Sequence, residues 1–294
     1  MTSWILPKGV ASRSCNINET DIHFLESGTQ GPILVLVHGL PFSSYMWRSV
    51  MSRLQDKFKC IAPDLFGCGL SINTADDCNL FEQIQIFTEW VLRMAGDQPV
   101  YLLGHGFGSV IVHGLCRSLG DKVLAVGFYE GYLNVITSIE QMGLPLHHLH
   151  ERLTEEDFDQ QVLDQNFMID QFLPMVSEGK LSEHTLDIYR SPFMNRHARE
   201  LLLHALGQMM DFSPGSLFSQ IIDSAHVVYE SSKLKKVLFY SMPGMVSGLL
   251  GLDDFKKRFP NTVITPVGQA MFLAPELNPE SFARGIRGSM NLDG

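Results

Sequence analysis

The sequence has no apolar run of the roughly 20 residues that a membrane-spanning helix needs. Residues 1–14 also lack a charged start followed by an apolar stretch, so we expect no signal peptide. Basic residues are few, with 22 Lys and Arg against 32 Asp and Glu, a formal net charge of −10. Such a surface repels phosphate backbones and anionic lipid, so nucleic acid and membranes are disfavoured as partners.

Cysteine is scarce as well. The five cysteines are an odd number, and no two of them have the C-x-x-C spacing. This usage disfavours a disulfide framework or a zinc site and is typical of free thiols in the cytoplasm, where we expect the protein. The histidines at 147, 148 and 150 have no Cys or carboxylate at ligand spacing. We interpret them as a solvated segment and expect neither a metal nor another cofactor.

Short apolar runs alternate with helical patterns in the first half of the chain. The unbroken run Ile33–Val37 predicts a strand buried on both faces, and similar runs follow. Strands that alternate with helices of this length predict a mostly parallel sheet flanked by helices, an α/β fold. The predicted strands are 22–26, 33–37, 58–62, 100–103 and 123–129, and the predicted helices are 45–54, 80–94 and 107–119.

The pattern changes after Glu130. Residues 131–212 are helical in pattern, and one or two amphipathic helices are predicted over 153–173, opened by Thr154. Strand-like runs return at 236–241 and 262–266, with helices at 249–258 and 279–290. We therefore predict a core of residues 1–130 and 213–294 with an all-helical cap of residues 131–212. Ligands of open parallel sheets bind beyond the carboxyl ends of the strands, where this cap would lie.

Four segments at the predicted strand ends carry a family resemblance. They are HGLPFSSYMWR at 38–48, PDLFGCGLS at 63–71, GHGFG at 104–108 and GQAMF at 268–272. Together with the cap they resemble the α/β-hydrolase superfamily, most closely its haloalkane dehalogenase and epoxide hydrolase branch, over roughly residues 20–290. The resemblance implies the α/β-hydrolase fold, with an inserted helical cap.

The residues that would carry the family's hydrolytic chemistry are replaced. The resemblance places the nucleophile, an Asp in this branch, at Gly106, and glycine has no side chain that can attack. It places the general base, a histidine, at Met271, and a thioether takes up no proton at neutral pH. No histidine follows His226, so a small shift of the alignment restores none. An engineered Gly106 is an alternative, but it would leave Met271 unexplained.

Dehalogenation by the family's route is disfavoured by two further positions. The family holds the halide with an Asn after His-Gly and a Trp after the nucleophile. These positions are Leu40 and Phe107, which have no N–H group in their side chains. Epoxide hydrolysis by an Asp–His pair is excluded together with dehalogenation, because it needs the same nucleophile and base.

Some of the groups that the family uses in catalysis have counterparts in this sequence. The resemblance places the family's acid at Glu130, and it matches the backbone N–H groups of Leu40 and Phe107 to the oxyanion hole. Glu130 is either an acid/base group or an inert relic. We expect structural roles for His105 and Asp64, and we place Ser109 and Cys116 past the site. The predicted lining of an apolar pocket is Leu40, Trp47, His105, Phe107, Phe167, Phe172 and Phe272.

These features favour an enzyme that has lost hydrolysis. It would act without a cofactor on a hydrophobic small molecule between core and cap, by cyclisation, rearrangement, addition or elimination, as in natural-product biosynthesis. One alternative is a non-catalytic binding protein, and another is a hydrolase with an unusual nucleophile. The sequence leaves the substrate and the oligomeric state open, and a homodimer is compatible with it.

Overall fold

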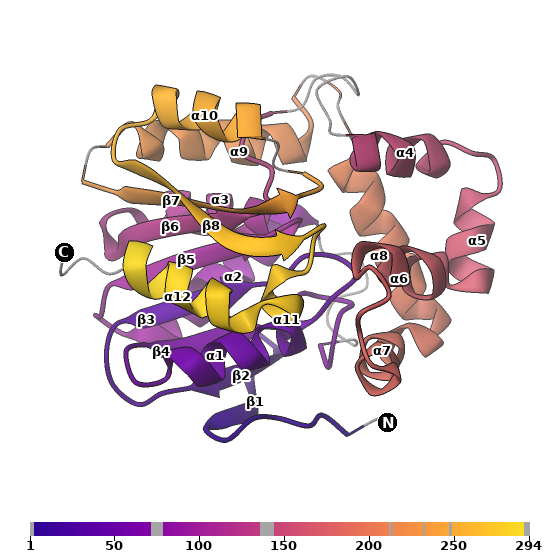
Figure 1. Ribbon diagram of the computed structural model, residues 1–294, viewed down its shortest axis with the longest axis horizontal. Helices are drawn as coiled ribbons and strands as arrows, with labels where there is room; N and C mark the ends of the chain where they lie inside the picture. Colours follow the sequence, from indigo (N-terminus) through magenta and orange to yellow (C-terminus); the bar gives the residue numbers. More distant parts are fainter. Residues whose placement is uncertain are drawn as a thin grey trace.

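The computed structural model describes residues 3–71, 79–135, 144–211, 213, 215–231, 233–246 and 249–290. In these residues eight strands form one sheet in the order β1-β2-β4-β3-β5-β6-β7-β8 (Figure 1). The pairs β1–β2 and β2–β4 are antiparallel, and the pairs from β4 to β8 are parallel. The strands are β1 (Val10–Ile17), β2 (Thr20–Ser27), β3 (Ile33–Val37), β4 (Lys59–Pro63), β5 (Val100–His105), β6 (Val123–Tyr129), β7 (Lys235–Pro243) and β8 (Thr262–Ala270).

The predicted α/β-hydrolase architecture, a mostly parallel sheet flanked by helices, is confirmed. β3 and β5 are buried along their whole length, as strands covered on both faces must be. β3 and β6 have the predicted bounds, whereas β7 and β8 extend beyond the predicted runs. β1 was not predicted. It is an edge strand whose middle residues are mostly exposed, so it contains no apolar run.

Helices pack in groups around the sheet. α1 (Arg48–Leu54) packs against α12 (Pro279–Ser289), and α3 (Gly108–Leu119) packs against both α2 (Leu80–Ala95) and α9 (Leu217–Tyr229). α10 (Leu249–Arg258) contacts β8, and the short α11 (Ala274–Leu277) precedes α12. The predicted helix 45–54 is a 3₁₀ turn, η1 (Ser44–Trp47), followed by α1, and α9 was not predicted. Between β5 and α3 the chain turns sharply at Gly106.

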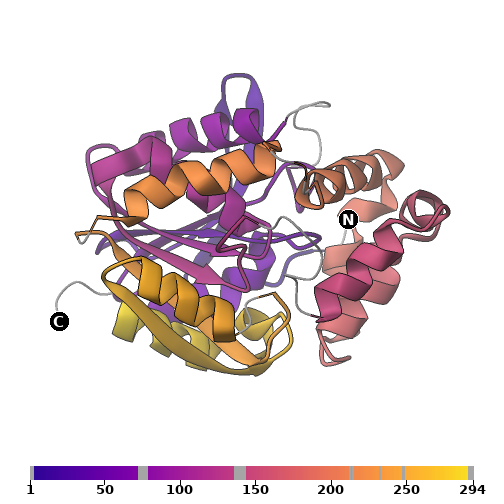
Figure 2. The same ribbon diagram turned by 90° about the horizontal axis from the view of Figure 1, so that it is seen from above.

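In the part of the chain that the structure describes, five α-helices lie beyond the carboxyl ends of the strands and are here called the cap helices. They form a group at one side of the core in Figures 1 and 2. A π-helical turn, η4 (Met168–Phe172), precedes the third of them. The division into a core of 1–130 and 213–294 and a cap of 131–212 stays a prediction. The cap helices are α4 (Leu144–Leu153), α5 (Phe158–Gln165), α6 (Leu173–Val176), α7 (Glu183–Arg190) and α8 (Arg196–Met209).

The prediction that Thr154 opens a helix is wrong. α4 ends at the preceding residue, and the Thr154 N–H group donates to the His150 carbonyl oxygen at 3.1 Å. Its hydroxyl donates to the Glu151 carbonyl at 2.8 Å. Thr154 therefore satisfies carbonyl groups at the end of α4, and α5 begins only after Asp157.

Two other expectations concern membranes and thiols. Among the described residues, no helix is both long enough and apolar enough to cross a bilayer. Cys15, Cys60, Cys68 and Cys116 are free, and Cys78 lies outside the described residues.

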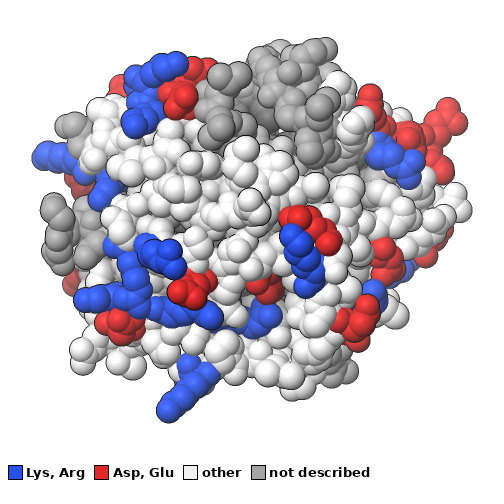
Figure 3. Space-filling model, viewed as in Figure 1, with Lys and Arg blue, Asp and Glu red and all other residues white. Residues whose placement is uncertain are grey.

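Acidic and basic side chains are interspersed over the face shown in Figure 3, with wide uncharged areas between them. The expected lack of nucleic acid and membrane partners stays a prediction.

Candidate functional site

A small cavity lies where the strand ends meet the cap helices, and we call it the inner cavity. The core side of the cavity comes from the ends of five strands, β3, β5, β6, β7 and β8, which are followed by Leu40, Phe107, Tyr132, Met245 and Phe272. Its volume is about 20 Å³, room for about one water molecule. The inner cavity is lined by Leu40, Phe107, Tyr132, Leu149, Met168, Phe172, Leu206, Met209, Met245, Val246 and Phe272.

A second cavity, which we call the outer pocket, has a volume of about 490 Å³. This volume is typical of sites for small organic ligands. Leu149 and Phe172 line both cavities, so the two cavities are neighbours. The outer pocket is lined by His148, Leu149, Arg152, Phe167, Gln171, Phe172, Met175 and Met271.

Gly106 stands at the sharp turn between β5 and α3, with a φ of 51°. Its N–H group donates to the Tyr129 carbonyl at 3.2 Å, which ties the turn to β6. A Cβ atom at this position would lie 2.9 Å from Cζ of Phe272. The space in which a nucleophilic side chain would begin is therefore occupied by an aromatic ring.

Met271 and His105 do not form a base at this turn. Met271 is half-buried and lines the outer pocket, and its N–H group donates to Glu178 Oε1 at 3.3 Å. His105 is fully buried, with Nε2 3.1 Å from the Phe272 carbonyl oxygen. Its Nδ1 accepts the Gly39 N–H at 3.3 Å, so the proton of the neutral ring is on Nε2. Burial lowers the pKa of His105 to about 3, and it lines neither cavity.

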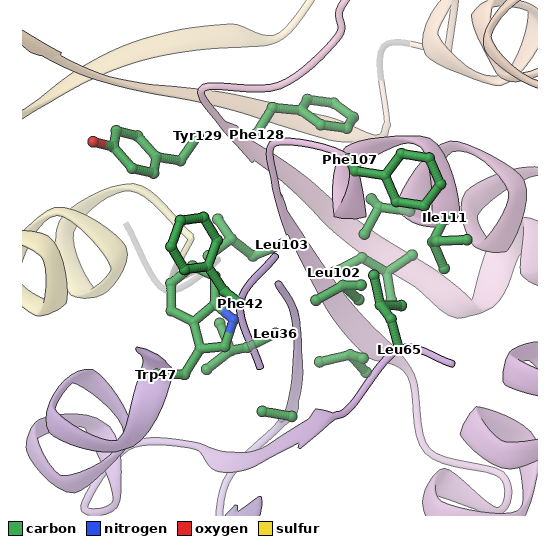
Figure 4. Packing of buried hydrophobic residues seen from close by; sticks show 14 of the residues in the cluster. Leu36, Phe42, Trp47, Leu65, Leu102, Leu103, Phe107, Ile111, Phe128 and Tyr129 are labelled. Carbon is green, nitrogen blue, oxygen red and sulfur yellow. The ribbon is translucent and has the colours of Figure 1, made fainter. Parts of the chain in front are cut away.

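The predicted pocket residues are brought together in part. Leu40, Phe107, Phe172 and Phe272 line the inner cavity, and Phe167 lines the outer pocket. Trp47 lines neither cavity. It is one of the buried core side chains in Figure 4, with its ring centroid 5.7 Å from that of Phe282 on α12. Trp47 therefore packs η1 onto the core instead of facing a ligand.

Glu130 follows β6 in the left-handed region, with a φ of 46°, and its side chain is fully buried. Its Oε2 accepts the backbone N–H groups of Met245 and Val246 at 2.9 and 2.5 Å. Met245 and Val246 line the inner cavity, whereas Glu130 is not part of its lining. Glu130 therefore fixes the segment that forms one wall. The sequence did not signal this segment, which follows the predicted strand without a motif.

The two expected oxyanion-hole residues, Leu40 and Phe107, both line the inner cavity. Within the described residues, neither of their backbone N–H groups donates a hydrogen bond. Ser109, the second residue of α3, donates its hydroxyl to the Gly106 carbonyl at 2.7 Å and accepts the Tyr132 N–H at 2.9 Å. Ser109 is thus held by hydrogen bonds to the backbone. Burial raises the pKa of the Cys116 thiol to about 12.

A serine, a histidine and an aspartate are hydrogen-bonded in series elsewhere, at the edge of the sheet. His23 Nε2 lies 2.8 Å from the Ser12 hydroxyl, and His23 Nδ1 lies 2.7 Å from Asp64 Oδ2. Ser12 is on β1 and His23 on β2, and none of the three residues lines either cavity. The sequence did not signal this series, because β1 itself was not predicted.

Asp64 has the contacts of a structural residue. It accepts the Ser44 N–H at 2.6 Å and the Leu70 N–H at 2.8 Å, in addition to the contact with His23. The hydrogen bond and the charge of His23 help to hold the pKa of Asp64 below its ordinary value despite burial. A Cβ at Gly69 would lie 2.1 Å from Asp64 Oδ2, so the turn after β4 closes tightly around this carboxylate.

The three histidines near residue 150 lie on α4. His148 is exposed and lies 3.1 Å from Glu151 Oε2. In the part of the chain that the structure describes, no three His, Cys, Asp or Glu residues are grouped so that they could hold a metal ion.

Comparison with known proteins shows the family to which this chain belongs. Residues 32–264 match the model of the alpha/beta hydrolase fold family. The chain belongs to this family. It is 27% identical over 267 residues to a haloalkane dehalogenase of Agrobacterium fabrum, covering 90% of this chain and 86% of that protein. It is 23% identical over 280 residues to coelenterazine h 2-monooxygenase of Renilla reniformis, covering 94% and 89%.

The solved structures agree with the family. The crystal structure of an ancestral haloalkane dehalogenase superposes with a TM-score of 0.85 at 23% identity, covering 94% of this chain and 97% of that one. A dehalogenase from Bradyrhizobium elkani gives a TM-score of 0.84 at 22% identity, covering 95% and 97%. At this identity the likeness shows the fold of this α/β-hydrolase and not its reaction.

Proposed function

We propose that this α/β-hydrolase-fold protein binds an apolar small molecule between its cap helices and the ends of its strands, and that it does not hydrolyse this molecule. The observation that carries the proposal is the ring of Phe272, which fills the space next to Gly106. A covalent intermediate needs a side chain at this turn with a base beside it. Gly106, Met271 and the bonded His105 supply neither.

The inner cavity offers little for proton transfer. Among its described lining residues, Tyr132 carries the one titratable group, and its hydroxyl donates to Met209 Sδ at 3.0 Å. Burial raises the pKa of Tyr132 well above its ordinary value, so it stays protonated at neutral pH. This lining favours binding, the first alternative that the sequence left open, over acid/base chemistry.

A non-hydrolytic, cofactor-independent enzyme is the second candidate, and a specific observation favours it. Leu40 and Phe107 line the inner cavity, and their N–H groups have no partners among the described residues, so these groups are available to stabilise an enolate or another developing oxyanion. The acid/base group of this candidate is Glu130, which does not line the cavity itself but accepts the N–H groups of the lining residues Met245 and Val246. The relative named as a monooxygenase is consistent with chemistry other than hydrolysis on a related chain. Natural-product biosynthesis, the cytoplasm and a homodimer stay predictions from the sequence.

Two model substrates, 4-nitrophenyl hexanoate and 1-bromohexane, test the proposal. We expect no release of nitrophenol or bromide above the rate in buffer. We expect both intact molecules to displace an uncharged, apolar fluorescent probe, N-phenyl-1-naphthylamine, from the protein. Mass spectrometry before and after incubation separates binding from any conversion.

A pair of variants locates the binding. Met175→Trp places a bulky ring in the outer pocket, and Met194→Trp does the same at an exposed methionine that lines neither cavity. Probe affinity should fall at least tenfold in Met175→Trp and stay within twofold in Met194→Trp. Equal affinities in the two variants would contradict the proposed site, and sustained release of nitrophenol or bromide would contradict the loss of hydrolysis.

A further inference from the structure

The polar residues that line the outer pocket differ in charge from the chain as a whole. Its three polar lining residues are His148, Arg152 and Gln171, and the other five are apolar. All three can donate hydrogen bonds, and no described lining residue is a carboxylate, although the chain has a net charge of −10. A ligand that matches this lining has an apolar body and an end that accepts hydrogen bonds.

Arg152 is held in a defined position at this pocket. Its Nη2 donates to Gln161 Oε1 at 2.5 Å, and Gln161 in turn donates to Asp157 Oδ2 at 2.8 Å. The guanidinium carbon lies 5.4 Å from the centroid of Phe167, which also lines the pocket. Gln161 is buried, so it orients the guanidinium along the aromatic wall.

The carboxylate of Glu155, which pairs with Arg152, can be displaced by the carboxylate of a ligand. Nη1 donates to Glu155 Oε2 at 2.7 Å, and the side chains of this pair are 40% and 42% exposed. Exposed ion pairs of this kind contribute little to stability. A guanidinium has five N–H donors in a planar fork, so three remain after the bonds to Glu155 and Gln161, and the fork suits a carboxylate.

We propose that the ligand is an amphiphilic carboxylate whose charged end is bound by Arg152 at the rim of the outer pocket. Its apolar body lies against Phe167, Met175 and Met271 and reaches towards Leu149 and Phe172, which line both cavities. This inference rests on the proposed function and adds to it the chemical class of the ligand.

Decanoate and 1-decanol test the inference, because they share a ten-carbon chain and differ in charge at one end. Binding is measured by isothermal titration calorimetry at pH 7. Decanoate should bind at least tenfold more tightly than decanol. Arg152→Gln should weaken decanoate at least tenfold and leave decanol within twofold. Glu155→Gln should strengthen decanoate about threefold, because it removes the competing carboxylate.

The matched control is Arg196→Gln, an exposed arginine of α8 that pairs with Asp164 and lines neither cavity. It should change neither affinity. If Arg152→Gln does not fold, Glu155→Gln and Arg152→Lys carry the test, the lysine keeping the charge without the fork. If decanol and decanoate bind equally tightly in all variants, the inference that the ligand is a carboxylate is overturned, while the proposed function stands. If neither molecule binds, both are overturned.

Discussion

Cζ of Phe272 lies 2.9 Å from the point at which a Cβ atom on Gly106 would lie. Cβ atoms essentially never approach a heavy atom this closely, so any other residue at 106 forces the ring to move. The ring itself is held by packing, with its centroid 4.3 Å from that of His105 and 5.9 Å from that of Phe42. The missing side chain at residue 106 and the position of the Phe272 ring therefore depend on each other.

Gly106→Ala should lower the free energy of unfolding by about 2–4 kcal/mol, combining backbone strain with displacement of the ring. Gly96→Ala is the matched control, because Gly96 has a φ of 56° and nothing within 4 Å of its Cβ position. It reports the strain alone, about 1–2 kcal/mol. In a Phe272→Leu background, which lacks Cζ, the cost of Gly106→Ala should approach that of Gly96→Ala. Urea unfolding of the set forms a double-mutant cycle, and equal costs in the parent protein would contradict the close contact.

Glu130→Ala should lower the free energy of unfolding by about 2–3 kcal/mol, because two buried backbone N–H groups lose a charged acceptor. Met245 and Val246 then lose their anchor, so affinity for the fluorescent probe should fall as well. Glu178→Ala is the control. That exposed carboxylate also accepts a backbone N–H, from Met271 at 3.3 Å, and its loss should cost little.

Glu130→Gln distinguishes the two roles of this residue. A structural acceptor is partly replaced by the amide oxygen, so stability should be intermediate and binding partly retained. An acid/base group is not replaced, because the amide transfers no proton. A fully stable Glu130→Gln variant that still binds a ligand but no longer converts it would establish the catalytic role and reject the purely structural one.

The central sheet could be predicted because its strands are buried on both faces and so consist of unbroken apolar runs, as in β3 and β6. β1 could not, because an edge strand with exposed middle residues has no such run. Thr154 was misassigned for a local reason. A threonine hydroxyl can accept at the start of a helix or donate at its end, and the sequence does not distinguish the two.

The site was predictable only where motifs mark it. Leu40, Phe107 and Phe272 lie just after strand ends and line the inner cavity, and their role at a functional site stays a prediction. Met245 and Val246 were not found, because they reach the cavity through hydrogen bonds to a carboxylate 115 and 116 residues earlier in the chain. Such a contact is visible only in the folded structure.

Acid should destabilise the protein through its buried histidines. Burial lowers the pKa of His105 and His113 from 6.5 to about 3. Between these values the unfolded chain binds a proton at each site and the folded chain does not, so stability rises with pH and is fully present above pH 6.5. The free energy of unfolding should fall by about 1.4 kcal/mol per pH unit for each histidine between pH 6 and pH 4.

The slope of stability against pH checks this assignment. His105→Asn or His113→Asn should each reduce the slope by about one proton. Met194→Leu, which changes an exposed residue without a titratable group, should leave it unchanged. An unchanged slope in both buried-histidine variants would show that the acid sensitivity has another source.

The series Ser12–His23–Asp64 has the connectivity of a catalytic triad, and it is the place where an unusual nucleophile would be sought. We expect Ser12 to be unreactive towards a fluorophosphonate probe. Asp64 is committed to the backbone of two turns, Ser12 lies on the edge strand β1, and none of the three residues lines either cavity. Mass spectrometry after labelling should find no adduct on Ser12. Labelling of Ser12 that disappears in His23→Gln would instead establish a second, hydrolytic site and revive the alternative of an unusual nucleophile.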